Sequence, residues 1–559
     1  MARGDVSLLR QAPRLTVALL CLPIAAGLAG TIWPALADHA AGLRMAIAWP
    51  GFQGALWLSI KTGFLATSIS LAVTLGLIAG LHGTRSFAAI QHLLAPLLSV
   101  PHAAAALGLA FLIAPSGWIS RIISPTLTGW SQPPDLLILN DPGGWALILG
   151  LVAKEIPFLF LLSLAALPQT DAARRMAVAY SLGAGRMAAF AVAVLPALYR
   201  QIRLPVYAVL AYSATAVEIA MILGPSLPPT LSVQIVTWMN DASLTQRETA
   251  AGGALIQLVT VVFLIAIWRV LERLARTGIR RWADAGARGH VLQRTFQPFA
   301  IMSGLVSAGL LVAGLAGLAL WSFAGLWPYP EALPQSFSLA IWNRTGDDLM
   351  TATWDTTRIA ATATLFALCL TLGCLEAERR FALRQGPTAA WLLYLPLLVP
   401  QIAFLPGLQG LALISGAEGH WTAVAAAHLI FVLPYLFLSL APAYRAWDTR
   451  YETAAMALGA PPARIFWKIR LPMLLRPILT AVAVGMAVSI GQYLPTLLIG
   501  GGRVATLTTE AVALSSGGNR RLIGAYAFLQ MALPTLFFSI ALLVPAFVFR
   551  NRRGLAVAG

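Results

Sequence analysis

The chain has 559 residues, of which 58% are hydrophobic and only 11% are charged, and its mean hydropathy is +0.78. Such a composition offers too little polar surface to cover a soluble globule of this size, so we predict an integral membrane protein. The formal net charge of +17 indicates membrane topology rather than nucleic-acid binding, because the arginines gather at the ends of apolar runs.

Apolar stretches of about 20 residues, long enough for a helix to cross a hydrocarbon core of about 30 Å, recur along the whole chain. They predict an all-α protein with twelve membrane-spanning helices. These lie near residues 15–36, 55–80, 88–113, 144–166, 204–224, 252–271, 299–322, 354–375, 390–414, 421–441, 477–499 and 522–549.

The basic residues set the expected orientation. Arginines cluster in the N-terminal tail, after the fourth, sixth and eighth predicted spans, and in the segment 451–472. All these sites fall on one side of a twelve-span arrangement, and basic loops are retained in the cytoplasm. We therefore expect both termini to be cytoplasmic. The first apolar run, 15–36, is longer than the apolar part of a signal peptide, so we interpret it as an uncleaved helix.

Parts of the sequence occur twice. The stretch "AYSLGAGRMAAFAVAVLP" at 179–196 aligns without a gap on "AMALGAPPARIFWKIRLP" at 455–472. A shorter match pairs "TLGL" at Thr74 with "TLGC" at Thr371. Repeats at this separation indicate an internal duplication of about half the chain.

The duplication predicts two six-helix halves, residues 1–271 and 299–559, joined by a basic cytoplasmic linker at 272–298. Because six is an even number of spans, both halves keep the same orientation in the membrane. The halves should then be related by a pseudo-two-fold axis along the membrane normal.

The segment 451–472 interrupts the apolar runs with a distinctive pattern. Good helix formers come first, Gly459 is placed to end that helix, and Pro461 and Pro462 enforce a turn. A second short helix follows and closes at Pro472. Two short helices at the cytoplasmic end of a span present side chains to a partner.

The sequence "ETAAMALGA" followed by "IRLP" resembles the EAA loop of permeases in binding-protein-dependent ABC importers. The resemblance covers both halves and implies the MetI-like permease fold, with each loop docking into a nucleotide-binding subunit. The first loop departs from the pattern, because Met176 stands where the second has Glu452. The coupling residues implied are Gly183, Ala184, Leu195, Pro196, Glu452, Ala454, Ala455, Gly459, Ala460, Leu471 and Pro472.

The resemblance implies a permease of a bacterial inner membrane with three partners besides lipid: two copies of an ATPase subunit and a periplasmic solute-binding protein. The lysines of the chain are Lys61, Lys154 and Lys468, and none follows a glycine as a phosphate-binding loop requires. We therefore expect a transport subunit rather than an enzyme, which itself binds no cofactor or metal. ATP and magnesium belong on the partner.

Polar residues inside predicted spans are costly and are the candidates for the solute path, although bonding between helices explains them equally well. They are Glu155, Glu218, Gln401, Gln492 and Tyr493. His102 and Gln401 follow Pro101 and Pro400, which match in the repeat and predict kinks.

The resemblance extends to fused permeases for ferric iron and for thiamine, and "LILNDPGGWALILGLVAKEIPFLFLL" at 137–162 is most similar to the thiamine group. A carboxylate beside the path favours a cation. Thiamine or a related organic cation is therefore the first expectation, iron(III) the second, and a sulfate-like anion the third.

A secondary transporter is the alternative from another class, since it also commonly has twelve spans in two halves. It leaves the paired loops unexplained. A membrane enzyme is disfavoured, because neither H-E-x-x-H nor G-x-S-x-G occurs in the chain.

Overall fold

The computed structural model describes residues 3–94, 96–286, 288–383 and 386–550. Within these ranges the only β-structure is an isolated antiparallel bridge between Ala324 and Phe337, so the expected all-helical class is confirmed. Ten described helices are long and apolar enough to cross a membrane, and two sharply bent helix pairs raise the count to twelve if each pair is one span.

The described residues up to 284 form twelve α-helices. They are α1 (Arg3–Ala48), α2 (Phe52–Leu81), α3 (Arg85–Leu94), α4 (His102–Ile113), α5 (Trp118–Ile123), α6 (Trp145–Ala166), α7 (Ala172–Ser181), α8 (Arg186–Ala189), α9 (Leu195–Thr215), α10 (Glu218–Leu223), α11 (Leu231–Met239) and α12 (Leu244–Asp284). Short 3₁₀ segments, η1 (Pro96–Ser99) and η2 (Leu167–Thr170), precede α4 and α7, and a π-helical segment, η3 (Phe190–Val194), precedes α9.

The remainder begins with α13 (His290–Phe323). It continues with α14 (Ala340–Arg344), α15 (Gly346–Arg380), α16 (Pro387–Leu398), α17 (Gln401–Ile414), α18 (Trp421–Arg445), α19 (Arg450–Ala457), α20 (Pro462–Ile465), the π-helical η4 (Phe466–Arg470), α21 (Leu471–Met473), α22 (Leu475–Ile490), α23 (Leu494–Gly500), α24 (Leu507–Leu514) and α25 (Arg520–Val548). The segment expected as a linker, 272–298, is thus formed largely by the end of α12 and the start of α13.

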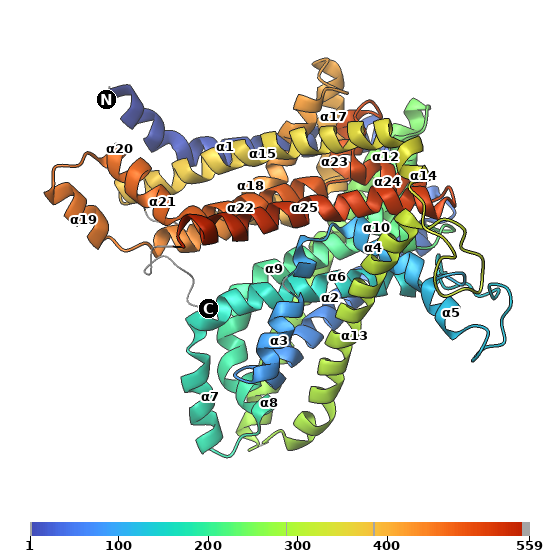
Figure 1. Ribbon diagram of the computed structural model, residues 1–559. Coiled ribbons are helices and arrows are strands. Elements are labelled where there is room, and N and C mark those ends of the chain that lie inside the picture. Colours follow the sequence, from blue (N-terminus) through green and yellow to red (C-terminus); the bar gives the residue numbers. More distant parts are fainter. Residues whose placement is uncertain (1–2, 95, 287, 384–385, 551–559) are drawn as a thin grey trace.

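The long helices form two bundles that diverge (Figure 1). One bundle contains α15, α18, α22 and α25, and the other contains α2, α6 and α9. They meet around α4, α10, α23 and α24, whereas α7 and α19 lie at the far ends of separate bundles. The two predicted coupling segments are therefore at the open end of the V-shaped arrangement.

The first long helix of each predicted half packs against helices of the other predicted half. Helix α1 packs on α15 and α17, and α13 packs on α2 and α4. Glycines permit both crossings: a Cβ on Gly108 would lie 2.8 Å from the carbonyl carbon of Gly314, and a Cβ on Gly30 would lie 2.9 Å from the Cα of Gly407. Close backbone approach of this kind is how small residues promote helix association in membranes.

Two predicted spans are broken at the matched prolines, which confirms the expected kinks. The span expected over 88–113 is split into α3, η1 and α4, with Pro101 directly before α4. In the span expected over 390–414, the axes of 391–398 and 401–414 differ by 88°. A proline removes a backbone donor and cannot continue the preceding turn, so the helix stops there.

Two further predicted spans contain a break that was not expected. For the span predicted over 204–224, α9 ends at Thr215 and α10 starts at Glu218; for 477–499, α22 ends at Ile490 and α23 starts at Leu494. Expecting one continuous helix in each place was wrong. The first break, at Ala216 and Val217, continues an apolar run, so hydropathy does not reveal it. The second break coincides with the polar residues Gln492 and Tyr493.

Helix α1 also differs from its predicted span. It continues beyond residue 36 to Ala48, but with non-helical backbone from Ala37 to Ala40. Asp38, His39 and Ala40 have positive φ there.

Candidate functional site

The second predicted coupling segment has the helix, turn and helix that its sequence indicates. Helix α19 is followed by Gly459, whose φ of +76° falls in the left-handed region that favours glycine. Helix α20 begins at Pro462, and the π-helical η4 leads into α21. Leu471 and Pro472 are thus the first two residues of α21, and Ala460 lies in the turn.

The first coupling segment has the same order of elements. Helix α7 is followed by Gly183 with a φ of +81°, then by Ala184, α8, the π-helical η3 and α9, which starts at Leu195 and Pro196. The gapless sequence alignment therefore pairs two left-handed glycines and two π-helical segments.

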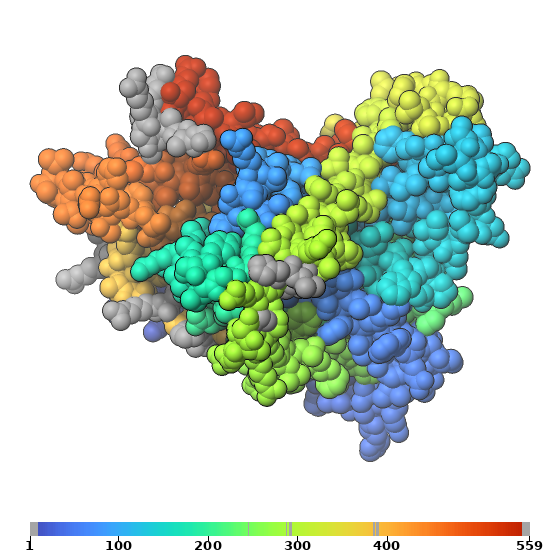
Figure 2. Space-filling model, turned by 90° about the horizontal axis from the view of Figure 1, so that it is seen from below, coloured from blue at the N-terminus to red at the C-terminus, as the bar shows by residue number. Residues whose placement is uncertain are grey.

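Apolar side chains stand exposed at both turns. Leu182 is 75% exposed and Leu458, at the matched position, is 88% exposed. Ala455 is buried, whereas Ala454 is exposed on α19. Figure 2 shows the α7 segment in teal and the α19 segment in orange at different places on the surface. Exposed apolar residues on a polar segment are typical of a contact surface.

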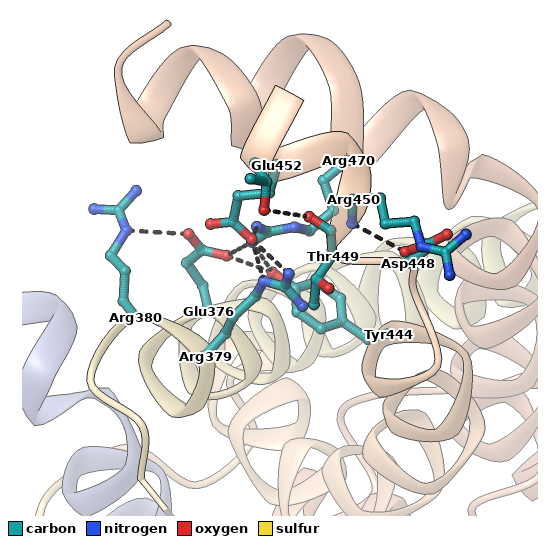
Figure 3. A network of polar contacts seen from close by, with 10 residues as sticks. Glu376, Arg379, Arg380, Tyr444, Asp448, Thr449, Arg450, Glu452 and Arg470 are labelled. Atoms are coloured by element: carbon teal, nitrogen blue, oxygen red, sulfur yellow. Dashed lines mark hydrogen bonds and ion pairs between the residues drawn. The ribbon is translucent and has the colours of Figure 1, made fainter. Parts of the chain in front are cut away.

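Glu452, the acidic residue of the predicted loop, is held by arginines of its own chain (Figure 3). Arg379 Nε donates to Glu452 Oε2 at 2.7 Å, and an Arg470 terminal nitrogen donates to the same oxygen at 3.0 Å. Glu376 and Tyr444 complete this network. Sequence reasoning missed both arginine partners of Glu452; the available signal was charged residues at the ends of apolar runs.

The candidate path residues of the first half lie around the helix breaks. Glu155 of α6 is buried and lies 3.5 Å from Nε2 of His102, the first residue after Pro101. Glu218, the first residue of α10, accepts a 2.7 Å hydrogen bond from Tyr212. The ring centres of His102 and Tyr212 are 4.7 Å apart. The two rings therefore lie between the carboxylates of Glu155 and Glu218.

The candidates of the second half occupy comparable breaks. Gln401 Nε2 lies 3.4 Å from Gln492 Oε1, joining the start of α17 to the break before α23. Tyr493, at the same break, is buried, and its hydroxyl lies 3.4 Å from the sulfur of Met221 in α10. Tyr493 thus contacts the first half, whereas Gln401 and Gln492 pair within the second.

Lys154, next to Glu155, has a different environment. Its Nζ donates to the carbonyl oxygens of Leu97 at 2.9 Å and Leu98 at 3.1 Å. These carbonyls belong to η1, directly before the Pro101 break, where the missing helical donors leave them free. Lys154 therefore stabilises the broken helix.

Known proteins are similar to this chain in sequence. A model of the family described as "binding-protein-dependent transport system inner membrane component" matches residues 370–553. The inner membrane ABC transporter permease protein YnjC of Escherichia coli is 34% identical over 469 residues, which cover 82% of this chain and 81% of that protein. The chain belongs to the family of binding-protein-dependent ABC transporter permeases.

Shorter similarities lie within the same family of ABC permeases. The molybdenum transport system permease protein ModB of Mycobacterium tuberculosis is 36% identical over 87 residues, covering 16% of this chain and 33% of that protein. The spermidine/putrescine transport system permease protein PotC of Haemophilus influenzae is 25% identical over 166 residues, covering 30% and 62%. This ABC permease is accordingly a multi-pass inner-membrane transport subunit of an importer, and its family implies an ATPase and a binding protein as partners.

Proposed function

We propose that this single chain forms the whole membrane pathway of an ABC importer from two fused halves, and that α7 and α19 each dock one copy of a nucleotide-binding subunit. The observation that carries the proposal is the recurrence of one local geometry in both halves. Gly183 and Gly459 have the same left-handed conformation, and exposed Leu182 and Leu458 stand beside them. Two docks of similar shape suit two copies of one partner.

The stoichiometry of the purified importer tests this proposal. The permease is co-expressed with its cognate ATPase subunit, purified without nucleotide, and weighed by native mass spectrometry. We expect two ATPase copies per permease chain. A complex with one copy, or a permease that transports without any ATPase, would refute the proposal and in the latter case favour a secondary transporter.

The orientation is part of the same proposal: the open end with α7 and α19, and both termini, face the cytoplasm. In a background where Cys21, Cys369 and Cys374 are changed to alanine, Asp135→Cys and Ala285→Cys place single thiols on exposed sites. An impermeant thiol reagent added from outside should label position 135 and spare position 285. The opposite pattern would invert the topology.

We propose that the solute is a small organic cation, with thiamine as the first candidate. Glu155 and Glu218 are buried carboxylates beside the helix breaks, and aromatic rings of Tyr212 and Tyr493 lie near them. A carboxylate with π-faces suits a flat cation. Iron(III) is the second candidate, because carboxylate and phenolate oxygens also suit that ion.

Uptake by cells expressing the complete importer distinguishes these solutes. Radiolabelled thiamine should accumulate in wild type, and Glu218→Gln should reduce its uptake severalfold while the protein level stays constant. Accumulation of labelled ferric iron instead would select the second candidate. Normal thiamine uptake in Glu218→Gln would remove Glu218 from the path without affecting the importer assignment.

A further inference from the structure

A charged network holds the second coupling segment to the end of the bundle (Figure 3). Glu452 of α19 is bridged by Arg379 from the end of α15 and by Arg470 from η4. Glu376, one turn before Arg379, pairs with Arg470 and accepts a 2.5 Å hydrogen bond from Tyr444 at the end of α18. The network therefore ties α19 to three other elements.

Arg470 is the centre of this network and is fully buried. Its side chain is 2% exposed, and Glu376 is 5% exposed. The Arg470 guanidinium also lies 4.7 Å from the ring centre of Trp447, and Arg379 lies 4.9 Å from the same ring. A buried guanidinium without its carboxylates would be an uncompensated charge, so the positions of Glu376 and Glu452 are strongly constrained.

The matched positions of the first half are apolar. The alignment of the two loops places Met176 opposite Glu452 and Val194 opposite Arg470, and the Thr74 and Thr371 repeats place Ala79 opposite Glu376. All three of these apolar residues are buried: Met176 is 5% exposed, Ala79 2% and Val194 0%. The three matched positions are thus charged and paired in the second segment, and apolar and buried in the first.

In the first segment, Arg186 bonds backbone carbonyl oxygens rather than carboxylates. Its guanidinium donates to the carbonyl oxygens of Ala79, at 3.0 Å, and His82. Burial, with the nearby Arg186 charge, lowers the pKa of His82, which favours a neutral imidazole there. Arg175 of α7 likewise donates to the carbonyl oxygen of Ala193 at 3.3 Å, so the first segment combines apolar packing with arginine contacts to carbonyl oxygens.

We propose that Glu376 and Arg470 are positioning residues for the second coupling segment, which fix α19 through Glu452, while apolar packing does the same for α7. This inference rests on the proposed function of α19 as a dock. Glu452 then acts inside the chain and not as a contact to the ATPase. Removing one charge of the network should misplace α19 and leave the dock formed by α7 intact.

Native mass spectrometry of the nucleotide-free complex tests the positioning role. We expect Arg470→Met, and separately Glu376→Gln, to weaken ATPase binding at the second dock about tenfold or more, so that complexes with one ATPase predominate. Met176→Leu, a volume-conserving change in the first segment, is the matched control and should retain two copies. If wild type itself lacks two copies, the proposed docks fail; if wild type and Arg470→Met both carry two, this inference alone fails.

A graft of the apolar contact separates positioning from partner contact. The triple variant Glu376→Ala, Glu452→Met and Arg470→Val copies the first half into the second, and replacing a buried ionic cluster by apolar residues is often tolerated. We expect it to bind two ATPase copies again. A well-folded graft that binds only one would assign Glu452 to the partner contact and overturn the inference. Aggregation of the single variants and the graft alike would also overturn it, because the network would then support the whole half.

Discussion

The glycines that follow the two proposed coupling helices, α7 and α19, differ in what surrounds them. A Cβ on Gly459 would meet nothing within 4 Å, whereas a Cβ on Gly183 would lie 3.3 Å from the guanidinium carbon of Arg288. Both residues have positive φ. At Gly459 the cost of a side chain is therefore the backbone conformation alone, and at Gly183 a steric contact is added.

Gly459 allows a clean test of that backbone cost. The left-handed conformation costs an alanine roughly 1–2 kcal/mol, and asparagine adopts it more readily. We expect Gly459→Ala to weaken ATPase binding by about 1 kcal/mol, a factor of about five, and Gly459→Asn to weaken it less. Titration of the purified permease with the ATPase subunit measures both. Equal affinities for the two variants would show that the left-handed backbone is not the cause of the loss.

Lys154 yields a second prediction. Changing Lys154 to methionine leaves the Leu97 and Leu98 carbonyls without their buried donor, at a cost of about 1.5–3 kcal/mol. Lys61→Met is the matched control, since Lys61 is only partly buried and bonds the single carbonyl of Gly143 at 2.7 Å. The midpoint temperature of thermal unfolding, measured in one detergent, should fall more for Lys154→Met than for Lys61→Met. The reverse order would argue against the role of Lys154 at the helix break.

The sequence predicted single residues well where the constraint is local. Gly459 was expected to end a helix because the following prolines make a turn there, and the structure agrees. The sequence did not predict that Glu452 is paired, because Arg379 and Arg470 lie 73 and 18 residues away along the chain. Only the folded bundle brings the end of α15 beside η4.

Among helices, the sequence predicted where each apolar segment lies but not where it breaks. The breaks at Pro101 and Pro400 could be predicted because proline has no backbone N–H to donate to a helical hydrogen bond. The break between α9 and α10 contains Ala216 and Val217, which continue an apolar run without a signal. Tertiary contacts decide it, since Gln257 donates to the free carbonyl of Ala214 and Tyr212 bonds Glu218.

Glycine contacts between helices give the third prediction. A Cβ on Gly407 would collide with the carbonyl oxygen of Gly27, where α17 crosses α1, so Gly407→Ala forces the two backbones apart. Overpacking of this kind costs about 1–3 kcal/mol. Gly309→Ala is the control, because a Cβ there meets nothing within 4 Å. The midpoint temperature of thermal unfolding should fall only for Gly407→Ala. An equal fall in both variants would exclude backbone contact as the cause.

Helices α1 and α13 link the two bundles into one molecule. The first long helix of each predicted half packs on the other, so we expect any relative motion of the bundles to move α1 and α13 as well. The bundles touch near α4, α10 and α24, and they diverge toward α7 and α19 (Figure 1). Rocking about the meeting point changes the separation of the coupling segments more than that of any residues near the breaks.

We therefore expect the distance between the two proposed coupling turns to change most during transport. Spin labels on Leu182→Cys and Leu458→Cys, in the background without native cysteines, occupy the exposed matched positions at the turns. When the complete importer binds a non-hydrolysable ATP analogue, closure of the ATPase pair should draw the turns together and shift the measured distance distribution to shorter values. The permease without its ATPase should show no shift with the same nucleotide, because no bound partner transmits the closure. An unchanged distribution in the complete importer would mean that α7 and α19 do not move with the ATPase pair, and would end their assignment as coupling segments.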